Sequence, residues 1–186
     1  MKSYAVKEIF YSLQGEGYHS GRAAILCRFT GCNLWSGRET DRANALCAFC
    51  DTDFVGVNGL GGGQFSIQAL VDKIIATWPS AQLNHRYIVC TGGEPLLQLD
   101  FPLIEAFHQV GFEVAIETNG TLAAPEGIDW ICVSPKGHAP LVLKKGHELK
   151  LVYPQPEAPP EHFEDLEFET FFCNPWPDLK VNAIPS

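Results

Sequence analysis

Residues 87–95 read YIVCTGGEP, an apolar run that ends in a polar turn with two glycines. A short apolar run rich in β-branched and aromatic residues predicts a buried strand. After the turn, Asp100 suits the N-cap of a helix over 100–110, and Gly111 suits the end of that helix. The next apolar run, 112–117, predicts another strand. This strand–helix–strand order indicates parallel strands joined by a helical crossover.

The same alternation continues on both sides of this unit. A helix is predicted over 66–78, with Ser66 as its N-cap and Pro79 as its stop. The glycine-rich stretch 56–63 is predicted to be a flexible connection, and the proline-rich stretch 154–160 a surface link. Together these elements predict an α/β barrel or an open α/β sheet. Further strands are predicted at residues 23–29, 130–133, 148–152 and 167–172.

Composition restricts the class of protein. The chain has 186 residues, of which 46% are hydrophobic, enough for one globular domain with a sizeable core. Its apolar runs are too short for a membrane span, and its start lacks the apolar core of a signal peptide. Seven cysteines, an odd number in a chain this large, indicate a reducing cytoplasm. A net charge of −9 argues against nucleic acid as a partner, so we expect a small-molecule substrate.

Polar residues cluster where three of the predicted strands end. They are TGGEP at 91–95, ETNG at 117–120 and SPK at 134–136. In folds with parallel strands, ligands bind at this carboxyl edge. Paired glycines let a ligand approach the backbone, while Glu94 and Glu117 can accept hydrogen bonds from an amine or from ribose hydroxyls. The sequence therefore predicts a ligand site at this edge.

Three cysteines point to the chemistry of that site. Cys47 and Cys50 are separated by two residues, so both sulfurs can face one ion or cluster, and Cys32 can add a third thiolate. A structural zinc site needs four ligands and usually shows two such pairs. One pair and one single cysteine leave an open position, as in an iron–sulfur cluster with one unligated iron. A zinc clip closed by a histidine, or three unrelated thiols, remain as alternatives.

Taken in order, these motifs resemble the radical S-adenosylmethionine superfamily. Within it, the segments FYSLQGEG at 10–17, FTGCNL at 29–34, CDT at 50–52 and SPK at 134–136 resemble the 7-carboxy-7-deazaguanine synthase family. The resemblance runs from about Tyr4 to Phe172, and we expect one domain over 1–172. One departure is the spacing between the first two cysteines of the triad. Fourteen residues, 33–46, separate Cys32 from Cys47, whereas the superfamily usually has three at this place. Some family members carry such a cluster-loop insertion, here about 33–65.

The resemblance implies a compact, incomplete (β/α) barrel of the radical S-adenosylmethionine type with parallel strands, usually a homodimer. The family converts 6-carboxy-5,6,7,8-tetrahydropterin to 7-carboxy-7-deazaguanine and ammonia, on the route to queuosine and related deazapurines. A [4Fe–4S] cluster, reduced by a flavodoxin-like donor, cleaves S-adenosylmethionine to methionine and a 5′-deoxyadenosyl radical. By similarity, this radical takes a hydrogen from pterin C6, the ring contracts, and the hydrogen is returned.

The resemblance also assigns residues to roles. The cluster ligands are Cys32, Cys47 and Cys50, and Thr52 matches the family's magnesium ligand. Residues that match the S-adenosylmethionine contacts are Gly93, Ser134, Pro135 and Lys136, with Glu117 and Asn119 expected at its ribose and carboxylate. Residues that match the substrate contacts are Leu13, Gln14, Gly15, Arg28 and Thr91, and Glu16 continues the same segment.

Two of these roles have structural alternatives. Arg28 is the single cation in the apolar strand 23–29, and a buried charge without a partner is costly. Its anion is either the substrate carboxylate, held bidentately, or an internal partner such as Glu16 or Glu94. A hydroxyl oxygen at Thr52 suits Mg²⁺, but a helix N-cap or a turn would use the same residue type.

Two other functions share some of these features. A zinc-binding interaction module could use the three cysteines and a histidine as a structural clip. A radical S-adenosylmethionine activating enzyme would act on a partner protein, and it would lack the features around Gln14 and Thr52. A brown, iron-containing protein would exclude the zinc module, and turnover of the pterin would exclude the activating enzyme.

The resemblance fails at the C-terminal end. After Phe172 the family typically reads Leu-Gln-Pro-Met, whereas this chain reads Cys-Asn-Pro-Trp at 173–176. Codons for the family motif, read one base later, can encode residues 173–179, so we interpret 173–186 as a frame-shifted tail. Because Pro175 and later prolines interrupt regular structure, we expect residues after Phe172 to pack weakly and leave the pocket open on one side.

The cysteine assignment is directly testable. Anaerobic reconstitution should give one [4Fe–4S] centre per chain, and alanine at Cys32, Cys47 or Cys50 should abolish it, because each supplies one of three thiolates. Iron content and the visible spectrum measure the result. Alanine at the remaining cysteines, of which Cys27, Cys90 and Cys132 lie in apolar strands, is the matched control and should leave the cluster intact. A fully loaded Cys47→Ala protein would contradict the assignment.

Overall fold

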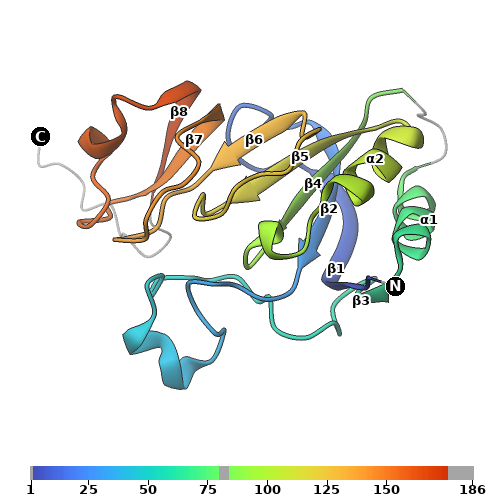
Figure 1. Ribbon diagram of the computed structural model, residues 1–186, viewed down its shortest axis with the longest axis horizontal. Helices are drawn as coiled ribbons and strands as arrows, with labels where there is room; N and C mark the ends of the chain where they lie inside the picture. The colour runs from blue at the N-terminus through green and yellow to red at the C-terminus, as the bar shows by residue number, and fades with distance from the viewer. Residues whose placement is uncertain (1, 80–83, 176–186) are drawn as a thin grey trace, which may run out of the picture.

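The computed structural model describes residues 2–79 and 84–175. Eight strands form one sheet in the order β3-β1-β2-β4-β5-β6-β7-β8 (Figure 1). The order has two ends, β3 and β8, so the sheet is open, as an incomplete barrel requires. The strands are β1 (Tyr4–Leu13), β2 (Ala23–Phe29), β3 (Gly63–Phe65), β4 (Arg86–Gly92), β5 (Phe112–Thr118), β6 (Trp130–Val133), β7 (Lys145–Tyr153) and β8 (Glu167–Pro175).

The sheet is mostly parallel, which confirms the predicted α/β class. Strands β2, β4, β5, β6, β7 and β8 pair in parallel, whereas β1 runs antiparallel to both of its neighbours, β2 and β3. The sequence pattern did not indicate β1 as a strand. Its register shifts between Val6 and Glu8, so the alternation of apolar and polar residues is interrupted there.

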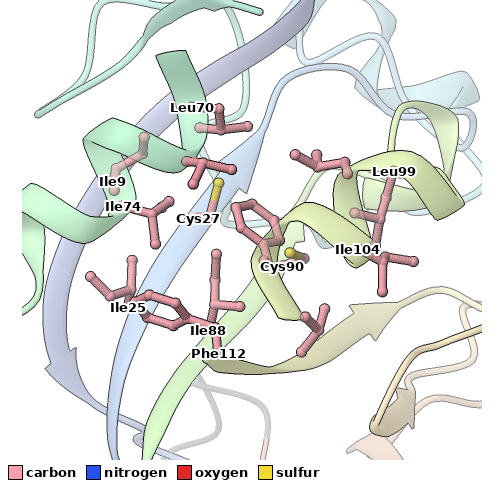
Figure 2. Packing of buried hydrophobic residues seen from close by; sticks show 14 of the residues in the cluster. Ile9, Ile25, Cys27, Leu70, Ile74, Ile88, Cys90, Leu99, Ile104 and Phe112 are labelled. Atoms are coloured by element: carbon pink, nitrogen blue, oxygen red, sulfur yellow. The ribbon is translucent and has the colours of Figure 1, made fainter. Parts of the chain in front are cut away.

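Both predicted helices are present. In α1 (Ile67–Thr77) the Ser66 side chain accepts a hydrogen bond from the Ala69 amide, and in α2 (Phe101–Gln109) Asp100 does the same for Leu103. Together α1 and α2 cover one face of the sheet, where their apolar side chains meet Ile25, Cys27, Ile88 and Cys90 (Figure 2). Within the described ranges, no helix is long and apolar enough to cross a membrane.

The opposite face of the sheet carries polar side chains and a small buried apolar cluster, which consists of Ala24, Tyr87, Val89 and Ala115. Successive residues of a strand point to opposite faces, so burial of Cys27 and Cys90 under the helices turns Arg28 and Thr91 the other way. The parallel register of β2 and β4 sets Arg28 beside Thr91. The predicted ligand site therefore lies where this face meets the carboxyl ends of the strands.

The glycine-rich stretch 56–63 is held by the sheet, so its prediction as a flexible connection is wrong. The Gly59 amide donates to the Lys7 carbonyl at 3.0 Å, and the Ile9 amide donates to the Leu60 carbonyl at 2.7 Å. These contacts pair backbone groups of β1 that would otherwise lack partners on that side. Gly63 is already the first residue of β3.

The first residues of the unusual tail also belong to the sheet. Residues 173–175 continue β8, and its pairing with β7 runs through Tyr153 and Pro175. The expectation of weak packing directly after Phe172 is therefore wrong for these residues. At an end of the sheet a proline costs no ladder hydrogen bond when its nitrogen faces away from the neighbouring strand. Residues 176–186 lie outside the described residues, and the frame shift stays a prediction.

Candidate active site

A pocket of about 440 Å³ lies at the carboxyl ends of the parallel strands. This volume is in the range of small-molecule sites. Leu13 and Pro135 are predicted site residues that do not line it: Leu13 is more than half exposed at the end of β1, and Pro135 is buried. The other predicted site residues line the pocket: Gln14, Gly15, Glu16, Arg28, Cys32, Cys47, Cys50, Thr52, Thr91, Gly93, Glu117, Asn119, Ser134 and Lys136.

The three predicted cluster ligands share this pocket as free thiols. Cys32 lies in the loop after β2, and its sulfur accepts a hydrogen bond from the Leu34 amide at 3.4 Å. Cys47 and Cys50 hydrogen-bond each other, which raises the pKa of Cys47 and lowers that of Cys50. Thiolates are the ligands that iron–sulfur clusters take, so this donor set fits a cluster.

A zinc ion and an iron–sulfur cluster place different demands on thiol ligands. Among the described residues, no three histidine, cysteine or carboxylate side chains are close enough to hold one metal ion. A zinc ion needs its ligands around one point, whereas a cluster of four irons spreads its thiolates over separate corners.

Glycines bring the end of β4 close to the cluster loop. Gly92 has a φ of 148°, in a region that side chains rarely adopt. At Gly93 a Cβ atom would overlap the carbonyl oxygen of Gly31 and the Cβ of Cys32. The two glycines thus let one strand end pack directly against the loop that carries the first thiol, in addition to leaving the backbone open to a ligand.

Glu94 joins two strand ends and does not line the pocket. It is fully buried, and its carboxylate accepts from the Leu96 amide at 3.0 Å, the Thr118 hydroxyl at 2.7 Å and the Asn119 amide at 2.8 Å. Burial raises the pKa of Glu94, and these hydrogen bonds oppose the rise. The expected contact of Glu94 with an amine or ribose is therefore replaced by a structural role, and Glu94 is not the partner of Arg28.

Asn119 extends this connection to the cluster loop. Its side-chain amide donates to the Asn33 side chain at 3.0 Å, and its side-chain oxygen accepts from the amide and hydroxyl of Thr121. Asn33 follows Cys32 directly. Asn119 therefore lies at the predicted edge, with its side chain engaged in holding the cysteine loop.

Arg28 has an internal partner that the sequence analysis did not propose. Its Nε donates to a Glu8 carboxylate oxygen at 2.7 Å, rather than to Glu16 or Glu94. Glu8 and Arg28 are opposed in the antiparallel register of β1 and β2, so recognition of β1 would have revealed this cross-strand pair. Within the described residues, the hydrogen bonds of Arg28 involve Nε alone, and Arg28 lines the pocket.

A network of charged and polar groups forms one wall of the pocket. Glu117 accepts from Gln14 and from Lys150, both at 3.0 Å, and Thr91 also hydrogen-bonds Glu117. Burial alone would raise the pKa of Glu117, but Lys150 lowers it overall, so this carboxylate stays ionised. Lys150 also contacts Glu16 at 3.1 Å.

The SPK segment after β6 is held from behind by a buried glutamine. Gln155 donates to the Pro135 carbonyl at 3.3 Å and accepts from the Gly137 amide at 2.6 Å. On the pocket side, the Lys136 ammonium folds back onto the Ser134 hydroxyl and carbonyl. Burial lowers the pKa of Lys136, and the nearby Cys47 thiol opposes the change.

The sequence pattern also failed to indicate Lys150, Asn174 and Gln155, which line the pocket or support it. Lys150 is a cation within an apolar strand, the same signal that singled out Arg28. Asn174 of the unusual tail lines the pocket and donates to Glu16 at 2.8 Å. The expectation that the pocket is open on one side stays a prediction, because residues 176–186 lie outside the described residues. Gln155 lies in the proline-rich link, where the sequence pattern carries no signal of its contacts.

No family model matches the chain, but individual proteins do. The 7-carboxy-7-deazaguanine synthase of Bradyrhizobium diazoefficiens is 64% identical over 184 residues, which are 97% of this chain and 87% of that protein. The 7-carboxy-7-deazaguanine synthase of Bordetella pertussis is 63% identical over 174 residues, 93% of this chain and 82% of that protein. The chain belongs to the 7-carboxy-7-deazaguanine synthase family. The resemblance inferred from the motifs is thereby confirmed.

A solved structure supports the same conclusion. The chain resembles the crystal structure of QueE from Escherichia coli with a TM-score of 0.73 and 26% sequence identity, covering 95% of this chain and 85% of that one. The expected fold of the radical S-adenosylmethionine type is therefore confirmed. Members of the 7-carboxy-7-deazaguanine synthase family are radical S-adenosylmethionine lyases that use a [4Fe–4S] cluster, which excludes the zinc-module and activating-enzyme interpretations.

The Glu117–Lys150 pair predicts a change in pH-dependent stability. In the native chain the ionised Glu117 contributes stability that is lost as pH falls through its lowered pKa. In Lys150→Met the buried carboxylate has no cation, so its folded-state pKa should rise above the unfolded value and stability should fall as pH rises. The loss of unfolding free energy in Lys150→Met relative to the native chain should therefore grow between about pH 4 and pH 7. It should reach up to about 3 kcal/mol.

Thermal unfolding across this pH range measures the effect. Lys145→Met is the matched control, because Lys145 is an exposed lysine on the same strand. Its Tm should follow that of the native chain at every pH. A Lys150→Met curve that runs parallel to the native one would show that the two groups are not coupled.

Proposed function

We propose that this chain converts 6-carboxy-5,6,7,8-tetrahydropterin to 7-carboxy-7-deazaguanine and ammonia by radical ring contraction, in the biosynthesis of queuosine and related deazapurines. The observation that carries the proposal is that three free thiols, a cation and an ionised carboxylate line one pocket of substrate size. The thiols are Cys32, Cys47 and Cys50, the cation is Arg28, and the carboxylate is Glu117. High identity to 7-carboxy-7-deazaguanine synthases over nearly the whole chain supports it.

The cofactor half of the pocket is built on the cysteine loop. We propose that Cys32, Cys47 and Cys50 hold the [4Fe–4S] cluster, which when bound supplies the electron that cleaves S-adenosylmethionine. The backbone at Gly93 is accessible to the methionine carboxylate or amine because the residue has no side chain. Ser134 and Lys136 line the same pocket, and Pro135 contributes through the backbone that Gln155 fixes.

The substrate half lies on the sheet face between β1, β2 and β5. We propose that the terminal nitrogens of Arg28 bind the pterin carboxylate while Nε stays on Glu8, because a guanidinium can meet two carboxylates at once. Glu117 bonds Gln14, so we place its carboxylate toward the pterin edge rather than the ribose. Gly15, Glu16 and Thr91 complete this wall, and Leu13 belongs to the segment through its backbone.

Magnesium, partners and location are finer parts of the proposal. Thr52 lines the pocket beside the cysteine pair, where a hydroxyl oxygen can ligate Mg²⁺ with substrate oxygens and water. The next element after Thr52 is the strand β3, so no helix follows that Thr52 could cap. We further propose a homodimer that works in the cytoplasm with a flavodoxin-like electron donor, with neither nucleic acid nor membrane as a partner.

The function is tested by turnover of the pterin. Anaerobically reconstituted protein with S-adenosylmethionine, reductant and Mg²⁺ should form 7-carboxy-7-deazaguanine and ammonia, detected by chromatography and mass spectrometry. Arg28→Ala should raise KM for the pterin roughly 10- to 150-fold, because loss of a charge-assisted pair costs about 1.5–3 kcal/mol. Iron content should not change. Arg22→Ala is the control, since Arg22 pairs with Glu113. A KM unchanged by Arg28→Ala would remove Arg28 from the substrate site.

The magnesium role of Thr52 is tested by titration. Thr52→Ala should lose most of the stimulation of turnover by Mg²⁺, because the variant lacks the ligating oxygen. Thr52→Ser keeps a hydroxyl and is the matched control, which should respond to Mg²⁺ like the native chain. Iron content is measured in parallel, since Thr52 follows the cluster ligands closely. An undiminished Mg²⁺ response in Thr52→Ala would place the metal elsewhere.

A further inference from the structure

The insertion between Cys32 and Cys47 carries an arginine that reaches the cysteine pair. Arg42 lies in the short 3-10 helix η1 (Glu39–Asn44), within the cyan segment that projects from the sheet in Figure 1. Its Nη1 donates to the carbonyl oxygen of Ala48 at 2.8 Å and to that of Cys50 at 2.9 Å. One guanidinium nitrogen thus binds two carbonyls of the C-x-x-C turn.

Two further contacts hold the guanidinium in place. Glu39 accepts from Nε of Arg42 at 2.7 Å and from Nη2 at 2.5 Å, a bidentate pair. The centre of the guanidinium lies 4.1 Å from the centroid of the Trp35 ring. Trp35 is itself buried and packs edge-on against Phe54. The planar group is therefore fixed on a rigid aromatic base, as a clamp on the turn requires.

The turn that Arg42 binds has little regular structure of its own. Residues 46–49 form turns outside any helix or strand. The positions of the sulfurs depend on the backbone of this turn, because the side chains of Cys47 and Cys50 are short. An exposed ion pair such as Arg42–Glu39 contributes little stability by itself, so the significance of Arg42 lies in its contacts with the turn.

We propose that Arg42 is a positioning residue for the cluster, which holds the Cys47–Cys50 turn in its binding conformation and adds positive charge beside it. This inference rests on the proposed function, since it requires a cluster at these thiols. Reduction makes a cluster more negative, and a nearby cation favours that state, so Arg42 raises the reduction potential. The insertion thereby tunes the cluster as well as lengthening the loop.

Neighbouring charges determine the direction in which Arg42 shifts the reduction potential of the cluster. Glu39 opposes Arg42, but its side chain is 75% exposed whereas that of Arg42 is 31% exposed, so water screens the carboxylate more strongly. Glu39 first, and then the Cys50 and Cys47 thiols, raise the pKa of Arg42, consistent with a cation close to both sulfurs. Lys136 is a second cation whose charge acts on Cys47, and it is unchanged in the variants below.

The test compares Arg42→Gln, Arg42→Lys and Arg38→Gln with the native chain, all reconstituted anaerobically without substrate or S-adenosylmethionine. Two properties are measured: the rate of iron loss to a chelator, and the midpoint potential by a redox titration followed by electron paramagnetic resonance. Arg38→Gln is the matched control, because it removes a positive charge from the same insertion. Arg38 is exposed, and its hydrogen bonds with Trp35 and Ser36 use its backbone.

Arg42→Gln should lose iron severalfold faster and shift the midpoint potential to a more negative value. Arg42→Lys should keep the potential close to native, because it keeps the charge, yet lose iron faster, because it lacks the planar fork. Arg38→Gln should match the native chain in both properties. In this result the midpoint potential depends on the charge at position 42, whereas iron retention depends on the planar guanidinium. A general loss of structure would change both properties in both Arg42 variants.

Other results would overturn the inference. An Arg42→Gln protein with native iron retention and potential would show that Arg42 does not position the cluster, and so would an equal effect of Arg38→Gln. If Arg42→Gln fails to fold, Arg42→Lys still decides, because native iron retention in that variant would exclude the clamp. A native chain that binds no cluster would instead overturn the proposed function, so the two failures are distinguishable.

Discussion

The structure depends on one constraint: each central strand must bury one of its two faces beneath α1 and α2. Ile25, Cys27, Ile88 and Cys90 meet that requirement and form the core with the helices (Figure 2). Because side chains alternate along a strand, the residues between them must face the other way. Arg28 and Thr91 are such residues, so packing of the core also places these two side chains in the pocket wall.

The strand ends are then joined by buried polar contacts rather than by apolar packing. Glu94 binds the end of β5 through Thr118 and Asn119, and Asn119 continues to Asn33 beside the first cysteine. A buried carboxylate with all its hydrogen bonds made is stable, whereas loss of one partner leaves an unsatisfied charge. This requirement links the GGEP and ETNG motifs to the cysteine loop, and it explains why polar residues at the edge serve architecture as well as ligand binding.

The pocket also shows how one charged group sets the state of another. Lys150 keeps Glu117 ionised within the wall, and Gln14 and Thr91 orient the same carboxylate. On the other side of the site, Arg42 and Trp35 support a turn that has no helix or strand to define it. Both arrangements bring together residues from distant parts of the chain, and both hold groups of the site by charge and hydrogen bonds.

Local patterns in the sequence determined the helices, most strands, the cysteine triad and the family, because capping, alternation and motif spacing are properties of neighbouring residues. The tertiary structure decided the partners: Glu8 for Arg28, Lys150 for Glu117, Gln155 for the SPK backbone and Asn174 for Glu16. Each of these depends on the pairing of strands or loops far apart in the chain. The antiparallel β1, hidden by its register shift, is the clearest case, since its position opposite β2 is set by the sheet and not by its own pattern.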